Sequence, residues 1–140
     1  MQADDTSRSV PTRILIVEDN ELNLRLLRDI LEFHGYAIVS TGLGATVVDL
    51  ARQHHPDLIL MDIQLLDISG IDAARQLKAD EETHSIPIIA VTAFAMPGDK
   101  LKILESGIDG YIAKPFKIQE MLNIVAEYLK GTLVPKEMRP

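Results

Sequence analysis

Five short apolar runs alternate with stretches whose apolar residues recur at helical spacing, and this alternation strongly constrains the fold. A continuous apolar run bounded by turn residues is typical of a strand buried on both faces of a parallel sheet. The clearest run covers residues 58–61 and leads into Asp62, followed by a polar loop that closes with Gly70. The full set of expected strands is 13–17, 36–39, 58–61, 86–91 and 109–113.

The stretches between these strands predict helices. Apolar residues recur every three or four positions over 21–34, 45–53 and 70–79, and again between a loop at 92–98 and Gly107 and in a last helix after Phe116. Strict alternation of strand and helix indicates a parallel sheet covered by helices on both faces, with right-handed crossovers. We therefore predict an α/β fold of the flavodoxin-like (βα)5 type. This fold is a three-layer sandwich around a parallel five-stranded sheet of order 2-1-3-4-5.

The length of 140 residues predicts one domain with a substantial core. We expect a disordered N-terminal segment at 1–12, a domain at 13–130 and a C-terminal tail at 131–140. About ten residues after the last helix are too few for a separate output domain.

Composition excludes several classes of function. The chain has no cysteine, which rules out disulfides and thiol chemistry and fits a cytoplasmic protein. A net charge of −7 without a cluster of Lys and Arg argues against nucleic acid as a partner. There is no apolar run long enough to insert in a membrane, and the first residues do not form a signal peptide.

Polar residues stand at the ends of four of the five expected strands. Glu18 and Asp19 follow the first, Asp62 follows the third, Thr92 ends the fourth and Lys114 follows the fifth. Because parallel strands end at one edge of the sheet, these side chains should converge. Two carboxylates ~4 Å apart repel by ~1 kcal/mol in water and ~4 kcal/mol at a partly buried site, so protonation or a cation must compensate. Oxygen ligands of this kind suit Mg²⁺, and a carboxylate beside Mg²⁺ and a lysine can act as a nucleophile toward phosphorus.

Each of these residues alone also has a purely structural interpretation. Glu18 and Asp19 could stabilise the start of the first long helix, Thr92 could be an ordinary strand residue, and Lys114 could be solvated. Their joint placement at one edge is much harder to explain by chance, and it favours a functional site.

Four segments of the chain resemble response-regulator receiver domains, over roughly residues 12–130. They read ILIVEDN at 14–20, LMD at 60–62, VTA at 91–93 and YIAKP at 111–115. The resemblance implies a two-component (phosphorelay) signalling protein that takes a phosphoryl group on Asp62 from a phosphohistidine of a histidine kinase or histidine phosphotransferase. It implies no enzymatic turnover beyond Mg²⁺-dependent self-phosphorylation and self-dephosphorylation.

The resemblance also implies a Mg²⁺ site. Asp19 and Asp62 would bind the ion directly, Glu18 would act through water, and the backbone carbonyl of Gln64 would supply a further ligand.

Further roles follow from the same resemblance. Thr92 would donate its hydroxyl to the phosphoryl oxygens, Lys114 would pair with them, and the Lys114–Pro115 peptide should be cis. Tyr111 matches the aromatic residue that moves as Thr92 is drawn toward the phosphate. A downstream protein partner would read the switch on the fourth helix, the fifth strand and the last helix.

The chain departs from the family at Leu66, where receivers commonly have proline. The loop thereby regains a backbone amide and loses a fixed φ. Because of this departure, an alternative function stays open, in which the receiver fold serves as a phosphorylation-independent interaction module.

Two other classes are less well supported. A Mg²⁺-dependent phosphatase with an aspartate nucleophile would need a second aspartate where Gln64 stands. A flavin or nucleotide module would need a phosphate-binding loop after the first strand, where Glu18 and Asp19 would repel a phosphate.

Overall fold

The computed structural model describes residues 11–93 and 97–131. The segments expected at 1–12 and 131–140 therefore lie almost wholly outside the described residues, as does part of the loop expected at 92–98. None of the described helices is long and apolar enough to cross a membrane.

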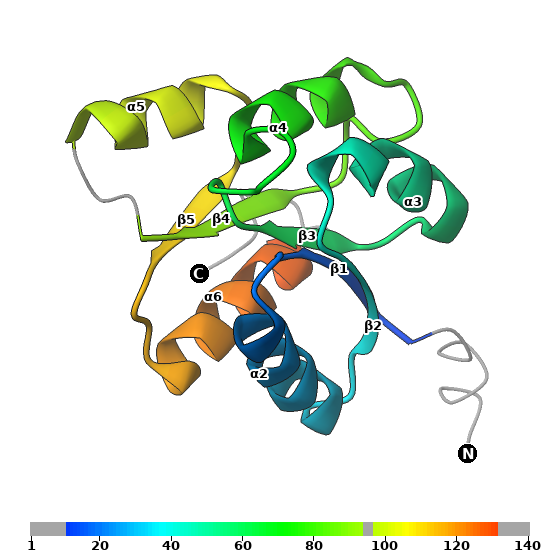
Figure 1. The fold of residues 1–140 in the computed structure, drawn as a ribbon. Helices are drawn as coiled ribbons and strands as arrows, with labels where there is room; N and C mark the ends of the chain where they lie inside the picture. Colours follow the sequence, from blue (N-terminus) through cyan, green and yellow to red (C-terminus); the bar gives the residue numbers. More distant parts are fainter. Residues whose placement is uncertain (1–10, 94–96, 132–140) are drawn as a thin grey trace.

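A five-stranded sheet forms the centre of the domain (Figure 1). Its strands are β1 (Arg13–Val17), β2 (Ala37–Thr41), β3 (Leu58–Met61), β4 (Ile88–Thr92) and β5 (Gly110–Ala113). All neighbouring strands pair in parallel, in the order β2-β1-β3-β4-β5. The predicted fold class and strand order are confirmed.

Helices cover both faces of the sheet (Figure 1). On one face lie α3 (Val47–His54), α4 (Gly70–Ala79) and α5 (Pro97–Glu105), and on the other lie α2 (Glu21–Phe33) and α6 (Ile118–Gly131). Alternate residues of β1 serve the two cores: Leu15 and Val17 face the α3–α5 side, while Ile14 and Ile16 face α2 and α6. The central strands β3 and β4 are buried throughout, as their continuous apolar runs predict.

The helices that follow β1 and β3 are each capped by the side chain of the residue before their first turn. The Asn20 side chain accepts a hydrogen bond from the Asn23 N–H at 2.9 Å and starts α2. The Ser69 hydroxyl accepts from the Ile71 N–H at 3.1 Å and starts α4. These caps hold the loops that follow β1 and β3 at the same edge of the sheet.

Several element boundaries differ from those expected. β4 begins at Ile88 rather than at residue 86, because Pro87 has no N–H for the ladder. The fourth helix begins at Pro97, which we placed in a loop, and proline is well suited to the first helical position. Residues 44–46 form a short 3₁₀ turn, η1 (Gly44–Thr46), ahead of α3.

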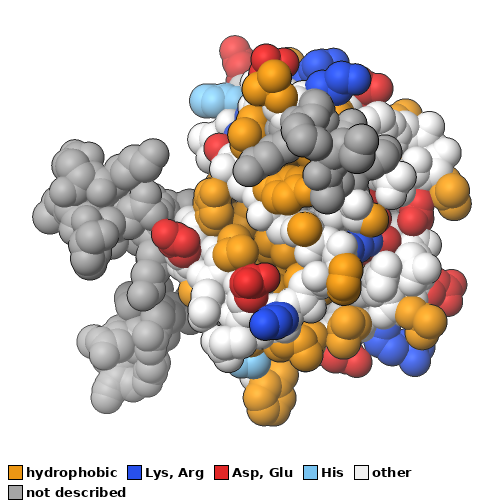
Figure 2. All heavy atoms as spheres, turned by 90° about the vertical axis from the view of Figure 1, so that its left-hand side faces the viewer, with side chains coloured by type: hydrophobic (Ala, Val, Ile, Leu, Met, Phe, Trp, Pro, Cys, Tyr) orange, Lys and Arg blue, Asp and Glu red, His pale blue; other side chains and the backbone are white. Residues whose placement is uncertain are grey.

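The side of the molecule formed by α5, β5 and the start of α6 carries hydrophobic side chains at its surface (Figure 2). Leu101 and Leu104 of α5 and Ile118 at the start of α6 are exposed by 59%, 45% and 49%.

Candidate functional site

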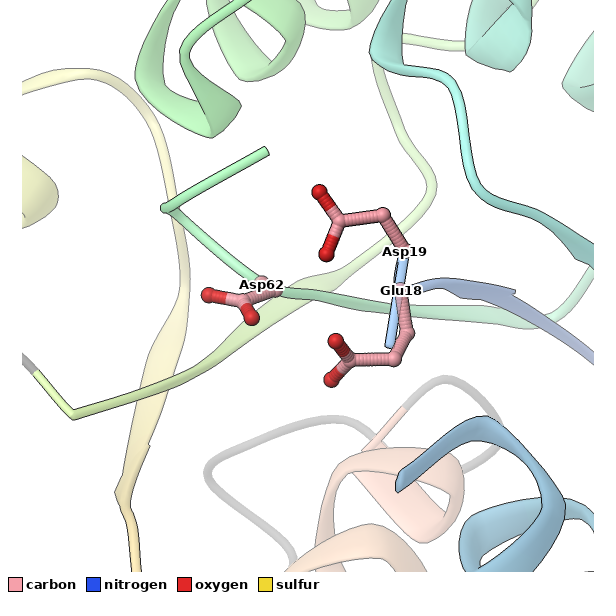
Figure 3. A group of neighbouring side chains, drawn as sticks. All are labelled: Glu18, Asp19 and Asp62. Atoms are coloured by element: carbon pink, nitrogen blue, oxygen red, sulfur yellow. The ribbon is translucent and has the colours of Figure 1, made fainter. Parts of the chain in front are cut away.

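Three carboxylates from two adjacent strand ends form the centre of the site. β1 pairs with β3 at Val17 and Met61, so the residues that follow these strands are neighbours. The Asp62 N–H donates to the Val17 carbonyl at 2.9 Å and extends this pairing by one residue. Glu18, Asp19 and Asp62 each offer a carboxylate oxygen within 4.8 Å of the others, and their side chains project to the same side (Figure 3).

Lys114 reaches this cluster from the end of β5. Its Nζ lies 3.0 Å from Glu18 Oε1 and 3.0 Å from Asp62 Oδ2. The Lys114 N–H donates to the Thr92 carbonyl at 2.9 Å, which continues the β4–β5 pairing beyond the strand. The Lys114–Pro115 peptide is cis, which confirms that prediction.

Burial and the shared ammonium group determine the charges on these side chains. Burial raises the pKa of the Glu18 carboxyl, and the hydrogen bonds from Lys114 and the Asn20 N–H only partly offset it. Burial works to lower the pKa of Lys114, but its hydrogen bonds to Asp62 and Glu18 outweigh that effect and raise it. The lysine is therefore charged at neutral pH, and one cation serves two buried acidic groups.

Among the residues that the structure describes, three carboxylates against one ammonium leave a formal excess of two negative charges when all are ionised. Mg²⁺ prefers oxygen ligands and is commonly held by one or two carboxylates together with water and phosphate. The charge and the donor set of Glu18, Asp19 and Asp62 both fit such an ion.

Asp62 has a separate hydrogen-bond donor for each of its oxygens. Oδ1 accepts from the Gln64 N–H at 2.9 Å, while Oδ2 accepts from Lys114. The side chain is 8% exposed, so these contacts fix its orientation in a largely water-excluded position. Gln64 follows in an exposed loop, and the contact it makes to Asp62 uses its N–H rather than its carbonyl.

Thr92 lies on β4, which is next to β3, and Tyr111 lies on β5, which is next to β4. Thr92 is the last residue of β4 and is fully buried. Tyr111 is half-buried on β5 and packs against the core beneath α4 and α5. Thr92 pairs with Ala113 and Tyr111 pairs with Ala90, so both predicted switch residues belong to the β4–β5 pairing.

Sequence reasoning missed the residue that links this edge to the turn after β2. The Asp67 carboxylate accepts from the Gly44 and Ala45 N–H groups, each at 2.9 Å. These hydrogen bonds lower the pKa of Asp67. An acidic residue in a polar loop is too common to signal such a contact in advance.

Comparisons with known proteins agree with the fold. Residues 14–126 match the family model described as "Response regulator receiver domain". The polar-differentiation response regulator DivK of Brucella ovis is 51% identical over 116 residues, which are 83% of this chain and 94% of that protein. DivK of Brucella anthropi is 48% identical over 120 residues, which are 86% of this chain and 98% of that protein. The residues around Asp19, Asp62 and Thr92 predict a likeness to DivK in particular, and the identities confirm this prediction.

Solved structures give the same result. The receiver domain of a sensor histidine kinase from Pseudomonas aeruginosa is 36% identical, with a TM-score of 0.80, and covers 86% of this chain and 99% of its own length. That structure has a magnesium ion coordinated in its active-site cleft. With a family match over most of its length and relatives at half identity, this chain belongs to the response regulator receiver domains.

Proposed function

We propose that the protein accepts a phosphoryl group on Asp62 from the phosphohistidine of a histidine kinase or histidine phosphotransferase. The observation that carries this proposal is the bridge from Lys114 to Asp62 and Glu18, beside the Asp19 carboxylate. An oriented carboxylate next to a fixed cation is what an acceptor of a charged phosphoryl group requires.

In the transfer step, an oxygen of Asp62 attacks the phosphorus. The phosphorus–nitrogen bond of the donor breaks, and its electron pair returns to the imidazole. Lys114 neutralises charge on the phosphoryl oxygens, and the hydroxyl of Thr92 would donate to one of them. Glu18, Asp19, Asp62 and the backbone carbonyl of Gln64 would hold Mg²⁺, which supplies further neutralisation of phosphoryl charge.

The donor would dock beside the acceptor, in a hollow between α2 and the loop that follows β5. This hollow has a volume of about 480 Å³ and is lined by Leu26, Pro115, Phe116 and Ile118, together with Lys114 itself. Lys114 thus belongs both to the acceptor site and to the wall of the hollow. An apolar patch of the donor protein seated here would place its phosphohistidine next to Asp62.

Phosphorylation would then change the binding of a downstream protein. The phosphoryl group carries roughly −1.5 to −2 charge where the carboxylate carried −1, which draws Thr92 inward and lets Tyr111 follow. We assign the readout to α5, β5 and α6, where Leu101 and Leu104 expose apolar surface (Figure 2). By the likeness to DivK, the partners would include histidine kinases that act in cell-cycle control.

Intact-mass measurement after incubation with acetyl phosphate and Mg²⁺ tests the proposal. One added phosphoryl group is expected on the wild type, with none on Asp62→Asn, and slow loss of that group would show self-dephosphorylation. A wild type that gains no mass from acetyl phosphate or from a phosphorylated kinase would favour the phosphorylation-independent interaction module. Turnover of a generic phosphate ester would favour the phosphatase instead.

A further inference from the structure

The loop after β3 contacts the acidic cluster through a backbone group that the proposed transfer does not use. The Leu66 N–H donates to Asp19 Oδ2 at 2.8 Å, across 47 positions of sequence. This is a short hydrogen bond to a charged acceptor, the stronger class of hydrogen bond in proteins.

The loop is anchored on both sides of Leu66, so the direction of this amide is fixed. Before it, the Gln64 N–H is bound to Asp62. After it, Asp67 is bound to the turn that contains Gly44 and Ala45. The Leu66 side chain is 89% exposed and adds little packing. What residue 66 gives to the site is therefore its N–H.

A donor on one carboxylate oxygen restricts rotation of the whole group. With Oδ2 held by Leu66, the orientation of the Asp19 carboxylate relative to the other two carboxylates is fixed. Groups that orient metal ligands in this way typically change metal affinity by 10–100-fold when they are removed. Proline at position 66 could not make this contact, because it has no N–H.

We propose that the backbone amide of Leu66 positions Asp19 as a Mg²⁺ ligand, so that the choice between proline and any other residue at position 66 sets the metal affinity of this protein. The inference rests on the proposed function, because it takes the cluster to be a Mg²⁺ site.

Two variants separate the amide from the side chain. Leu66→Ala keeps the N–H and removes the apolar side chain, whereas Leu66→Pro removes the N–H. Mg²⁺ is titrated into ¹⁵N-labelled full-length protein and followed by amide chemical shifts, which tolerate weak binding. We expect Leu66→Ala to bind within about twofold of the wild type and Leu66→Pro to bind about 10–100-fold more weakly. Equal affinity of Leu66→Pro and the wild type would overturn the inference and leave the proposed function standing.

Hydrogen exchange in metal-free protein provides a second measurement that does not depend on a proline variant. The Leu66 amide should exchange slowly in the wild type and at least about tenfold faster in Asp19→Ala, while the Gly44 and Ala45 amides keep their protection. Equally fast exchange of Leu66 in both proteins would refute the contact. If the wild type binds no Mg²⁺ at all, the proposed function falls and the inference falls with it.

Discussion

Replacing Lys114 by glutamine should destabilise the metal-free protein, because it removes the cation that two buried acidic groups share. Glutamine keeps much of the side-chain volume and can still donate hydrogen bonds, so the change is mainly one of charge. Glu18 and Asp62 are only 3% and 8% exposed, and water cannot replace the ammonium freely.

The distances set the scale of this effect. A unit charge pair 3.0 Å apart attracts by about 5 kcal/mol at an effective dielectric constant of 20, and Lys114 makes two such contacts. Much of this attraction offsets the cost of burying the charges, and breaking a buried pair costs about 3–5 kcal/mol in other proteins. Lys114 is one-fifth exposed and Glu18 can take up a proton, so we expect a loss of about 2–4 kcal/mol at pH 7.

The size of the loss should depend on pH in a definite direction. The pKa of Glu18 is raised in the folded protein, so the folded state binds this proton more tightly than the unfolded state. Stability therefore falls as the pH rises above the ordinary carboxyl pKa, and without Lys114 it should fall further. The difference between the wild type and Lys114→Gln should accordingly be smaller at pH 5 than at pH 7.

Urea unfolding at both pH values, with and without Mg²⁺, measures these quantities. Mg²⁺ should stabilise Lys114→Gln more than the wild type, because the variant has more uncompensated negative charge. Arg75→Gln is the control: it breaks the exposed ion pair with Asp72 and should cost less than about 0.5 kcal/mol. If Lys114→Gln costs no more than this control, the charge-balance argument is wrong.

Three further predictions concern Asp62 and the loop that follows it. Asp62→Asn removes one of three crowded charges, so the metal-free protein should be about 1 kcal/mol more stable, and urea titrations should show that Mg²⁺ no longer stabilises it strongly. Gly70→Ala would place a Cβ 2.5 Å from the Asp62 carbonyl, which should cost about 1–3 kcal/mol by thermal unfolding and slow phosphorylation by acetyl phosphate. The lowered pKa of Asp67 means that its hydrogen bonds to Ala45 and Gly44 stabilise the fold above the ordinary aspartate pKa and are lost as the pH falls through the folded value. The advantage of the wild type over Asp67→Asn should thus shrink below about pH 4, and an advantage unchanged at pH 3 would contradict this assignment.

The fold was predictable because the apolar runs and the strand-end residues are local signals. Residues 58–61 form a continuous apolar run, and β3 covers those same residues. The predicted boundaries were wrong where a single proline determines them. Pro87 lacks an N–H and lies outside β4, and Pro97 is the first residue of α5.

The candidate site was predictable for a different reason. In a parallel sheet the carboxyl ends of the strands share one edge, so the topology alone brings Glu18, Asp19, Asp62 and Lys114 together. The contacts between loops were not predictable. The contacts of Asp67 and of the Leu66 amide depend on how two loops pack against each other. The residue types at these positions do not predict such contacts.

Under the proposed function, the charges of the site would link metal binding to phosphorylation. In the acceptor state, two excess negative charges favour a divalent cation at the three carboxylates. When a phosphoryl group of roughly −1.5 to −2 charge replaces the charge of −1 on Asp62, the excess grows, because within the described part of the chain Lys114 alone supplies an ammonium group to these carboxylates. A cation that favours phosphorylation must itself be bound more tightly by the phosphorylated protein, because coupling between two ligands is reciprocal. If Asp62 is the acceptor as proposed, we therefore expect tighter Mg²⁺ binding after phosphorylation, as a consequence of the same charge imbalance.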